Sequence, residues 1–335
     1  MSESAPPKPP LQVRLRRNVG ARVRRTRKRL DNPEVRAARN LALALEQGPV
    51  DVLHFGASES LFTADYDEDR RTLPQLYAAG LPQGTRFHSV VGPGYHPALF
   101  KTYLDIAAAH GSRPLLIIGL CIRLGEPAWL FHPEYGYVRP LAKLRKIKPG
   151  ARSARFRALV PPASPAEMKR HDELPHSTVA GTMPVSEYRR RLKNPAAAGL
   201  DADQALHLLM AYHHGATVEL DEGYLADATA LGARVRELGL DVVLYQMPVP
   251  MEQAKKILGP EVQPFIEARM LALENAFQAG FSPDGSARAT IVHSGTSLPN
   301  EMFIDPNDGS EHVNELGRHH IADQVVAEVL AKLSS

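Results

Sequence analysis

A serine and a histidine lie in two short segments whose composition could support nucleophilic catalysis. Ser58 follows the apolar run at residues 50–55, in a turn of small side chains that reads GASES. His312 stands near the other end of the chain, just before an amphipathic pattern at residues 315–333. A serine hydroxyl is a weak nucleophile that needs a base to take its proton, and an oriented imidazole can be that base. The two segments therefore predict Ser58 as nucleophile and His312 as general base.

Two aspartates precede His312 and could orient its imidazole. The segment reads FIDPNDGSEHVNELG over residues 303–317, so Asp305 and Asp308 both lie within one short stretch. Both carboxylates are candidates for that role. The sequence leaves the choice between them open.

Together the two segments resemble the first and last sequence blocks of the SGNH/GDSL hydrolases, a superfamily of serine esterases and acyltransferases. The turn at residues 56–60 is similar to the family's Gly-Asp-Ser turn, although an alanine replaces the aspartate. The stretch at residues 312–317 matches the family's histidine, asparagine and glycine, whereas a glycine stands where the family has its aspartate. The resemblance implies a catalytic triad of Ser58, His312 and Asp308.

The resemblance also implies an oxyanion hole, the set of donors that stabilises the negative oxygen of the tetrahedral intermediate. In the family these donors are the nucleophile's backbone N–H, a glycine after the second strand and an asparagine after the third. Ser58 and Gly94 fit the first two, with Gly92 as a rival for the second. Cys121 stands in the asparagine block and is a weak donor, so the third donor is Arg123, a backbone amide or a residue from the segment 124–221, or it is missing. Because losing one donor costs roughly 100- to 1000-fold in rate, we expect a specialised acyltransferase or slow deacylase.

Few other residues point to a ligand. Two residues are candidates for substrate binding: His96, shortly after the second expected strand, and Arg123, directly after the third. No phosphate-binding loop or dinucleotide fingerprint is present, and the remaining histidines lack the spacing of a zinc site, so neither cofactor nor metal is expected. His213 and His214 are instead expected to interact with the last carbonyls of the helix that they end.

Strands and helices alternate along the chain, which is typical of a parallel sheet with right-handed crossovers. The apolar run PLLIIGLCI at residues 114–122 predicts a strand buried on both faces. Strands are expected at 50–55, 86–91, 114–122, 241–245 and 289–293, and helices at 31–47, 97–110, 201–214, 222–238, 252–279 with a break at 259–260, and 315–333. The pattern predicts an α/β fold, a three-layer α/β/α sandwich, and the resemblance implies a flavodoxin-like parallel five-stranded sheet. Ser58, Gly94 and Cys121 then fall at the carboxyl ends of strands, where such sheets bind ligands.

Residues 124–221 interrupt this alternation and are expected to form a lid or cap on a domain that spans residues 31–335. A span of this length is much longer than an ordinary connecting loop. It carries a basic run from Arg139 to Arg157 that suits an anionic group such as a phosphate or a lipid headgroup. A solvated basic surface fits the same run equally well.

Residues 1–30 form a basic tail that is expected to be disordered. Nine arginines and lysines and no acidic residue fall within residues 14–29, although the whole chain carries a net charge of only +3. Such a tail suits an anionic membrane surface, and a merely solvated extension is an equal alternative. Nucleic acid is not an expected partner, because no aromatic side chain lies among the arginines to stack on bases.

The single cysteine, Cys121, excludes an intrachain disulfide. No apolar stretch is long enough to cross a membrane, and no apolar core of a secretory signal follows the basic start. We therefore expect a cytoplasmic protein, peripheral to a membrane if the tail binds lipid.

The expected function is a serine-dependent ester hydrolase or O-acyltransferase that acts on an acyl ester of a saccharide or lipid through an acyl-enzyme. The saccharide rests on analogy at the level of the fold. The alternative is a non-catalytic binding protein for a glycan or membrane surface, which the altered asparagine block favours. A third possibility is a nucleic-acid-binding protein that acts through its tail, for which Ser58→Ala would leave function intact.

Overall fold

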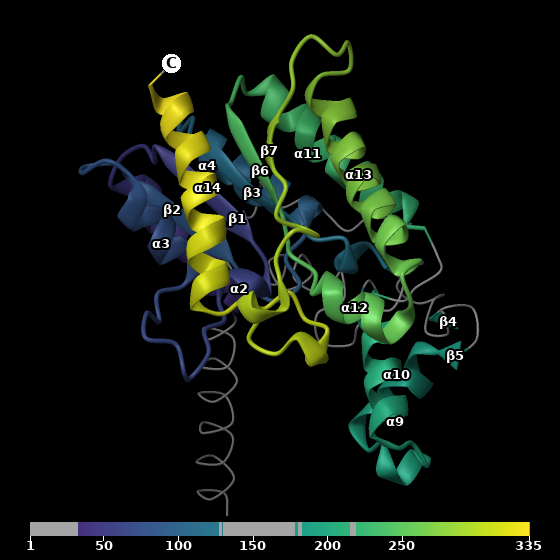
Figure 1. The fold of residues 1–335 in the computed structure, drawn as a ribbon. Coiled ribbons are helices and arrows are strands. Elements are labelled where there is room, and N and C mark those ends of the chain that lie inside the picture. The colour runs from purple at the N-terminus through teal and green to yellow at the C-terminus, as the bar shows by residue number, and fades with distance from the viewer. Residues whose placement is uncertain (1–32, 127–128, 130–177, 180–182, 215–218, 335) are drawn as a thin grey trace, which may run out of the picture.

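Figure 1 shows the fold in a computed structural model, which describes residues 33–126, 129, 178–179, 183–214 and 219–334. A parallel sheet of five strands forms the centre, in the order β2-β1-β3-β6-β7. The strands are β1 (Val52–Gly56), β2 (Phe87–Val91), β3 (Leu115–Leu120), β6 (Val242–Gln246) and β7 (Thr290–Val292). Every residue of β3 is buried, because the strand is central and both faces of the sheet are covered.

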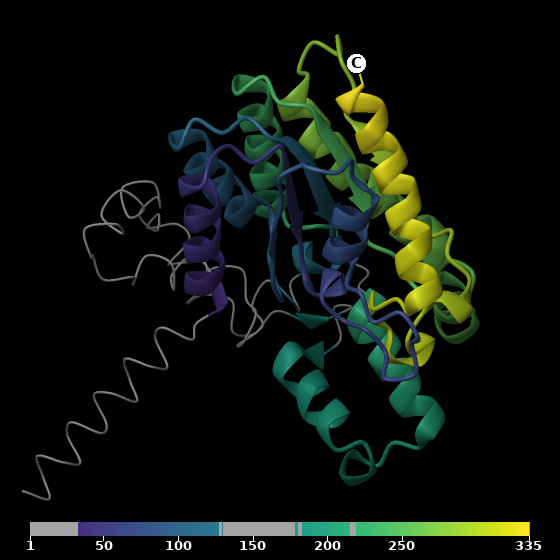
Figure 2. The same cartoon turned by 90° about the vertical axis from the view of Figure 1, so that its left-hand side faces the viewer.

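Helices cover the two faces of the sheet. The helices of the sheet domain are α2 (Pro33–Glu46), α3 (Leu73–Gly80), α4 (Pro97–Ala109), α11 (Glu222–Glu237), α12 (Met251–Leu258), α13 (Val262–Phe281) and α14 (Glu315–Leu333). The α3 and α14 helices pack together on one face, whereas α2, α4, α11 and α13 lie on the other (Figures 1 and 2). This arrangement confirms the α/β fold and the three-layer α/β/α sandwich.

The five strands lie where the sequence predicted them, with ends that differ by one or two residues. The break at residues 259–260 is also present, since α12 ends at Leu258 and α13 begins at Val262. The prediction did not include α3, although its start carries a recognisable signal. Thr72 and Gln75 form a capping box there, and a proline stands in the first turn.

The insertion contributes two helices and a small hairpin within the described residues. These are α9 (Val185–Lys193), α10 (Ala202–His214) and the antiparallel strands β4 (Thr178–Val179) and β5 (Met183–Pro184). The α10 helix packs against α12 and against the short 3-10 helix Pro306–Asp308, so part of the insertion adjoins the loop that carries His312. Figures 1 and 2 show α9 and α10 projecting beyond the sheet at the end where α14 begins.

The basic run at 139–157 and the tail at 1–30 both lie outside the described residues. Among the helices that the structure does describe, none has both the length and the apolar character needed to cross a membrane.

Candidate active site

A cavity of about 370 Å³ lies at the carboxyl ends of strands β1, β3 and β6. This is the edge at which parallel sheets of this type bind their ligands. The cavity wall includes six of the nine residues that the sequence offered as candidates or alternatives: Ser58, Gly94, Cys121, Arg123, Asp308 and His312. The fold thus brings two segments from opposite ends of the chain to one cavity.

Ser58 begins the 3-10 helix Ser58–Ser60, directly after β1, and is half-buried at the cavity wall. The neighbouring Glu59 is 1% exposed and holds this turn in place. Its Oε1 accepts hydrogen bonds from the Ala57 backbone N–H (3.1 Å), the Ser60 hydroxyl (2.7 Å) and the Tyr245 hydroxyl (2.8 Å). Burial raises the pKa of the Glu59 carboxyl, while these hydrogen bonds oppose the rise. Glu59 thereby joins the turn at residues 56–60 to β6.

His312 lies in the loop before α14, where its ring stacks on Phe62 with 4.0 Å between the ring centroids. Its Nε2 is buried and has no hydrogen-bond partner among the described residues, so no hydrogen bond joins this atom to Ser58. Burial, and secondly the charge of Arg123, lowers the pKa of His312 to about 4. The imidazole is therefore neutral at neutral pH and able to accept a proton.

Asn314 and Gly317, which follow His312 in the sequence, each have a structural role at the start of α14. The side chain of Asn314 accepts a hydrogen bond from the Gly317 N–H and caps the N-terminus of α14. A Cβ atom on Gly317 would lie 2.5 Å from the backbone oxygen of Met302, so a larger residue would push the helix away from the loop. These two residues fix the start of α14, and so the place of His312 in front of it.

A buried ion pair between Arg318 of α14 and Asp67 connects the His312 loop to residues 61–72, which follow the nucleophile turn. The Arg318 Nη1 lies 2.8 Å from Asp67 Oδ2, and the two side chains are 0% and 1% exposed. The guanidinium also donates to the backbone oxygens of Arg71 (2.9 Å), Asp69 (2.6 Å) and Val313 (3.2 Å). We call this pair and its hydrogen bonds the clamp.

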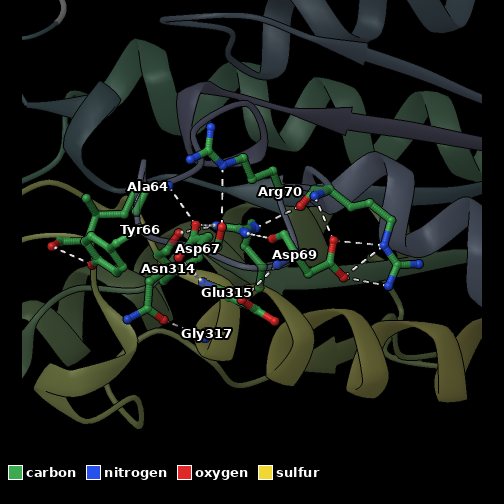
Figure 3. A network of polar contacts seen from close by, with 12 residues as sticks. Ala64, Tyr66, Asp67, Asp69, Arg70, Asn314, Glu315 and Gly317 are labelled. Atoms are coloured by element: carbon green, nitrogen blue, oxygen red, sulfur yellow. Dashed lines mark hydrogen bonds and ion pairs between the residues drawn. The ribbon is translucent and has the colours of Figure 1, made fainter.

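Backbone groups complete the clamp on the acidic side (Figure 3). The Asp67 carboxylate accepts hydrogen bonds from the backbone N–H groups of Ala64 (2.7 Å) and Glu315 (3.1 Å). Burial acts to raise the pKa of Asp67, but the hydrogen bonds from Arg318 and from the backbone outweigh it and lower the pKa. The Glu315 side chain in turn accepts from the N–H groups of Glu68 and Asp69 at 2.9 Å each. The loop after Ser58 and the helix after His312 are thus held in one register.

The two candidate acids differ in position. Asp308 lies in the cavity wall, and its Oδ1 accepts a hydrogen bond from the Ser310 N–H (2.6 Å). Asp305 is exposed and its Oδ1 caps the 3-10 helix Pro306–Asp308 by accepting from the Asn307 N–H (2.9 Å). These hydrogen bonds connect each carboxylate to its own loop rather than to His312.

Arg123 lies just beyond β3 and forms a buried polar cluster with two residues that the sequence analysis did not place there. Its guanidinium pairs with Glu311, donates to Nδ1 of His213 (2.9 Å) and lies 4.3 Å from the centroid of the Trp129 ring. Burial raises the pKa of Glu311, and the adjacent Arg123 charge opposes that rise. The expectation for His213 and His214 was wrong, because His213 binds Arg123 and His214 Nε2 lies 2.6 Å from the Gly309 oxygen. The contact arises because the tertiary fold packs α10 against the loop before α14. The position of the two histidines at a helix end therefore did not predict their partners.

The remaining candidates divide between the cavity and the core. Gly94 lies in the wall with a positive φ of 72°, whereas Gly92 does not belong to the described lining. Cys121 also lines the cavity, and its buried thiol lies 3.9 Å from Glu311 Oε1. Burial raises the pKa of this thiol, which keeps it protonated. His96 precedes α4 as its N-cap residue, is 1% exposed and is not among the residues of the cavity wall.

The described residues contain no group of histidine, cysteine, aspartate and glutamate side chains arranged to hold a metal ion. Comparison with known proteins adds no assignment: no protein-family model matches the chain, and neither does any curated protein. The chemistry of the cavity therefore has to be argued from its own residues and from the resemblance in the two sequence segments.

Proposed function

We propose that the chain is a serine-dependent ester hydrolase or O-acyltransferase of the SGNH/GDSL type. One observation carries the proposal: Ser58 and His312 line the same cavity, and Nε2 of His312 is buried there without a hydrogen-bond partner among the described residues. Buried polar atoms are nearly always paired, and an unpaired one at a cavity calls for a functional reason. A neutral imidazole that accepts a proton during the reaction would be such a reason. Catalytic hydrogen bonds are often formed only when the substrate binds.

In the proposed reaction the Ser58 hydroxyl oxygen attacks the acyl carbonyl carbon while His312 Nε2 takes the hydroxyl proton. The tetrahedral intermediate collapses, the bond between the carbonyl carbon and the leaving alcohol breaks, and His312 returns the proton to that alcohol. Water or an acceptor hydroxyl then attacks the Ser58 ester, with His312 again as base. The second collapse restores the serine hydroxyl and releases an acid or a new ester.

The backbone N–H groups of Ser58 and Gly94 are the proposed oxyanion donors. The Cys121 thiol is a weak donor, and it contacts the Glu311 carboxylate rather than pointing to a free acceptor. A hole with two strong donors supports the expectation of a slow or specialised enzyme, since each donor contributes roughly 100- to 1000-fold in rate. Acylated saccharides and lipids are the proposed substrates, and a cytoplasmic location near an anionic membrane belongs to the same proposal.

A non-catalytic binding protein is the second candidate. It is favoured by Cys121, a weak hydrogen-bond donor that stands where the family has its asparagine donor. Such a protein would use the same cavity to hold an acylated glycan or lipid without cleaving it.

Covalent labelling of Ser58 tests the proposal against this alternative. We expect the wild-type protein to gain the mass of one phosphonyl group with a fluorophosphonate, as measured by intact mass, and Ser58→Ala to gain none. The labelling should be repeated with phenylmethylsulfonyl fluoride, a smaller reagent, so that crowding by the insertion does not prevent access. Wild-type protein that stays unlabelled by both reagents would support the binding protein.

The acid side of the pH profile is a further prediction. A base has to be deprotonated to act, and burial lowers the pKa of His312 to about 4. Ester hydrolysis is therefore expected to keep its full kcat/KM down to about pH 5 and to fall tenfold per pH unit only below about pH 4. Initial rates between pH 3.5 and 8, with circular dichroism to verify folding at each pH, measure this limb. A midpoint near 6.5, the ordinary value for histidine, would contradict the buried position of the ring.

Asp308→Asn and Asp305→Asn form a matched pair that tests the third triad member. Only Asp308 belongs to the cavity wall, so we expect kcat to fall at least tenfold in Asp308→Asn and to stay within twofold of wild type in Asp305→Asn. Steady-state kinetics with one soluble ester measures both. Full activity in both variants would show that His312 works without a carboxylate from this loop.

A further inference from the structure

We propose that the acyl group bound in this cavity is an apolar chain of about six to eight carbons rather than an acetyl group. The inference rests on the proposed function and specifies its substrate. It starts from the surface that the cavity offers to a ligand.

Most of the surface that the described residues give to the cavity is apolar. Phe62, Pro93, Leu124, Trp129, Leu209 and Met247 contribute to the wall. These residues come from five different segments of the chain, so the apolar character belongs to the cavity as a whole and not to one helix face.

Two of the charged side chains in the wall, Arg123 and Glu59, are engaged with other protein groups. Arg123 is paired with Glu311 and hydrogen-bonded to His213, and Glu59 accepts three hydrogen bonds at its Oε1. A ligand with its own charge in this part of the cavity would compete with those pairs and would have to be stripped of water. An uncharged hydrocarbon chain leaves them intact.

The cavity is too large for a two-carbon acyl group. Its volume of about 370 Å³ lies at the lower end of the range for small-molecule sites, roughly 300–1,000 Å³. At about 30 Å³ for each water-sized group, it has room for roughly a dozen heavy atoms, whereas an acetyl group has only three. A chain of about six to eight carbons, with the first atoms of the alcohol, fills that space.

Filling the cavity has a predictable kinetic effect. Each methylene group that leaves water for an apolar wall is worth about fourfold in kcat/KM. Hexanoyl has four more methylenes than acetyl, so the expected advantage of a hexanoyl ester is on the order of 200-fold. The gain should end when the chain reaches the limit of the cavity.

A larger side chain at Leu209 should shorten the acyl chain that the cavity can hold. Leu209 is half-buried on α10, within the insertion, and it faces the cavity. Leu208, next to it on the same helix, packs instead against Tyr188 and Tyr212 and provides a control for the same substitution. Trp129 provides a second readout, because it is the only tryptophan of the chain and lies in the cavity wall.

The experiment measures kcat/KM for p-nitrophenyl esters from acetate to decanoate, below their micelle concentrations, with the full chain. For the wild type we expect a rise of about fourfold per methylene up to six to eight carbons and no further rise beyond. Leu209→Trp should lower the ratio of the octanoate to the acetate kcat/KM at least tenfold relative to the wild type. Leu208→Trp should keep the wild-type profile, with the melting temperature of each variant measured alongside.

A profile that is flat, or that falls from acetate onward, while hydrolysis still depends on Ser58, would overturn the inference and leave the proposed function standing. Absence of hydrolysis for every ester, together with no fluorophosphonate adduct, would overturn the proposed function. Chain binding is then tested by Trp129 fluorescence of the Ser58→Ala variant, titrated with methyl octanoate and methyl acetate. A response to octanoate at a concentration at least tenfold lower than to acetate supports the apolar site, and equal responses exclude it.

Discussion

Ser58→Ala and His312→Ala are each expected to reduce kcat for ester hydrolysis by a factor on the order of 10⁶, and the double variant is expected to be no slower than either one. The reason is that the two residues act together in one step of the proposed reaction. Without His312 the Ser58 hydroxyl keeps its proton, and without Ser58 the imidazole has no nucleophile to activate. The activity that remains comes from the oxyanion donors and from substrate binding, which neither substitution removes.

Burst kinetics with a p-nitrophenyl ester measures acylation and deacylation separately for the wild type and the three variants. Ser297→Ala and His293→Ala are matched controls, because both side chains are exposed and neither belongs to the cavity wall. Their kcat should stay within twofold of the wild type. Losses that multiply in the double variant would show that Ser58 and His312 act independently. A Ser58→Ala variant within tenfold of wild type would place the nucleophile elsewhere.

Local sequence patterns predicted the sheet well, because each strand has its own physical signature. The run at residues 114–122 is apolar at almost every position, which only a strand buried on both faces requires. The glycine and proline at 259–260 marked the boundary between α12 and α13 for an equally local reason. The strand ends also indicated the edge of the sheet at which Ser58, Gly94 and Cys121 meet.

The partners of the charged residues could not be predicted in the same way. Asp67 and Arg318 lie far apart in the chain, and nothing near either residue indicates the other. The same holds for Arg123, whose contacts with His213 and Glu311 depend on how α10 and the loop before α14 pack. Such pairs are set by tertiary packing, which a pattern in one sequence does not contain.

The sequence beside Ser58 carries a signal for a buried acidic residue, Glu59, that the prediction of the site did not include. Glu59 stands between two serines in a turn that follows a buried strand, where a charged side chain would be costly without partners. That cost predicts a set of hydrogen-bond donors around it. The structure supplies them from Ala57, Ser60 and Tyr245.

Breaking the clamp is expected to have a large effect on the stability of the fold. Arg318→Met and Asp67→Asn are each expected to lower the free energy of unfolding by about 3–5 kcal/mol, because each leaves a buried charge without its partner. The pair is suited to such a loss, since its side chains are 0% and 1% exposed and Arg318 also donates to three backbone oxygens. Urea denaturation at pH 7 measures the change. Arg71→Gln is the control, because the Arg71 side chain is 48% exposed in its pair with Asp69 and should be replaceable without measurable loss.

The loss of unfolding free energy in Asp67→Asn should become smaller as the pH falls. The clamp lowers the pKa of Asp67 in the folded protein, so the carboxylate contributes stability above its unfolded pKa of about 3.9 and loses that contribution as the pH falls through the folded value. The difference between wild type and Asp67→Asn should therefore be constant between pH 5 and 8 and shrink below about pH 4. A difference that grows on acidification would contradict the ionised state of Asp67.

The clamp is also expected to link stability to the proposed catalysis, because it holds the loop after Ser58 and the helix after His312 in one register. A displacement of about 1 Å between reacting groups costs on the order of 100-fold in rate, so clamp variants should lose kcat well below their melting temperatures. The double variant Asp67→Leu with Arg318→Met removes both charges and should recover most of the stability, since no unpaired charge remains. It should not recover kcat, because the apolar pair lacks the backbone hydrogen bonds that hold the two loops in register. Recovery of both together would show that the clamp serves folding alone.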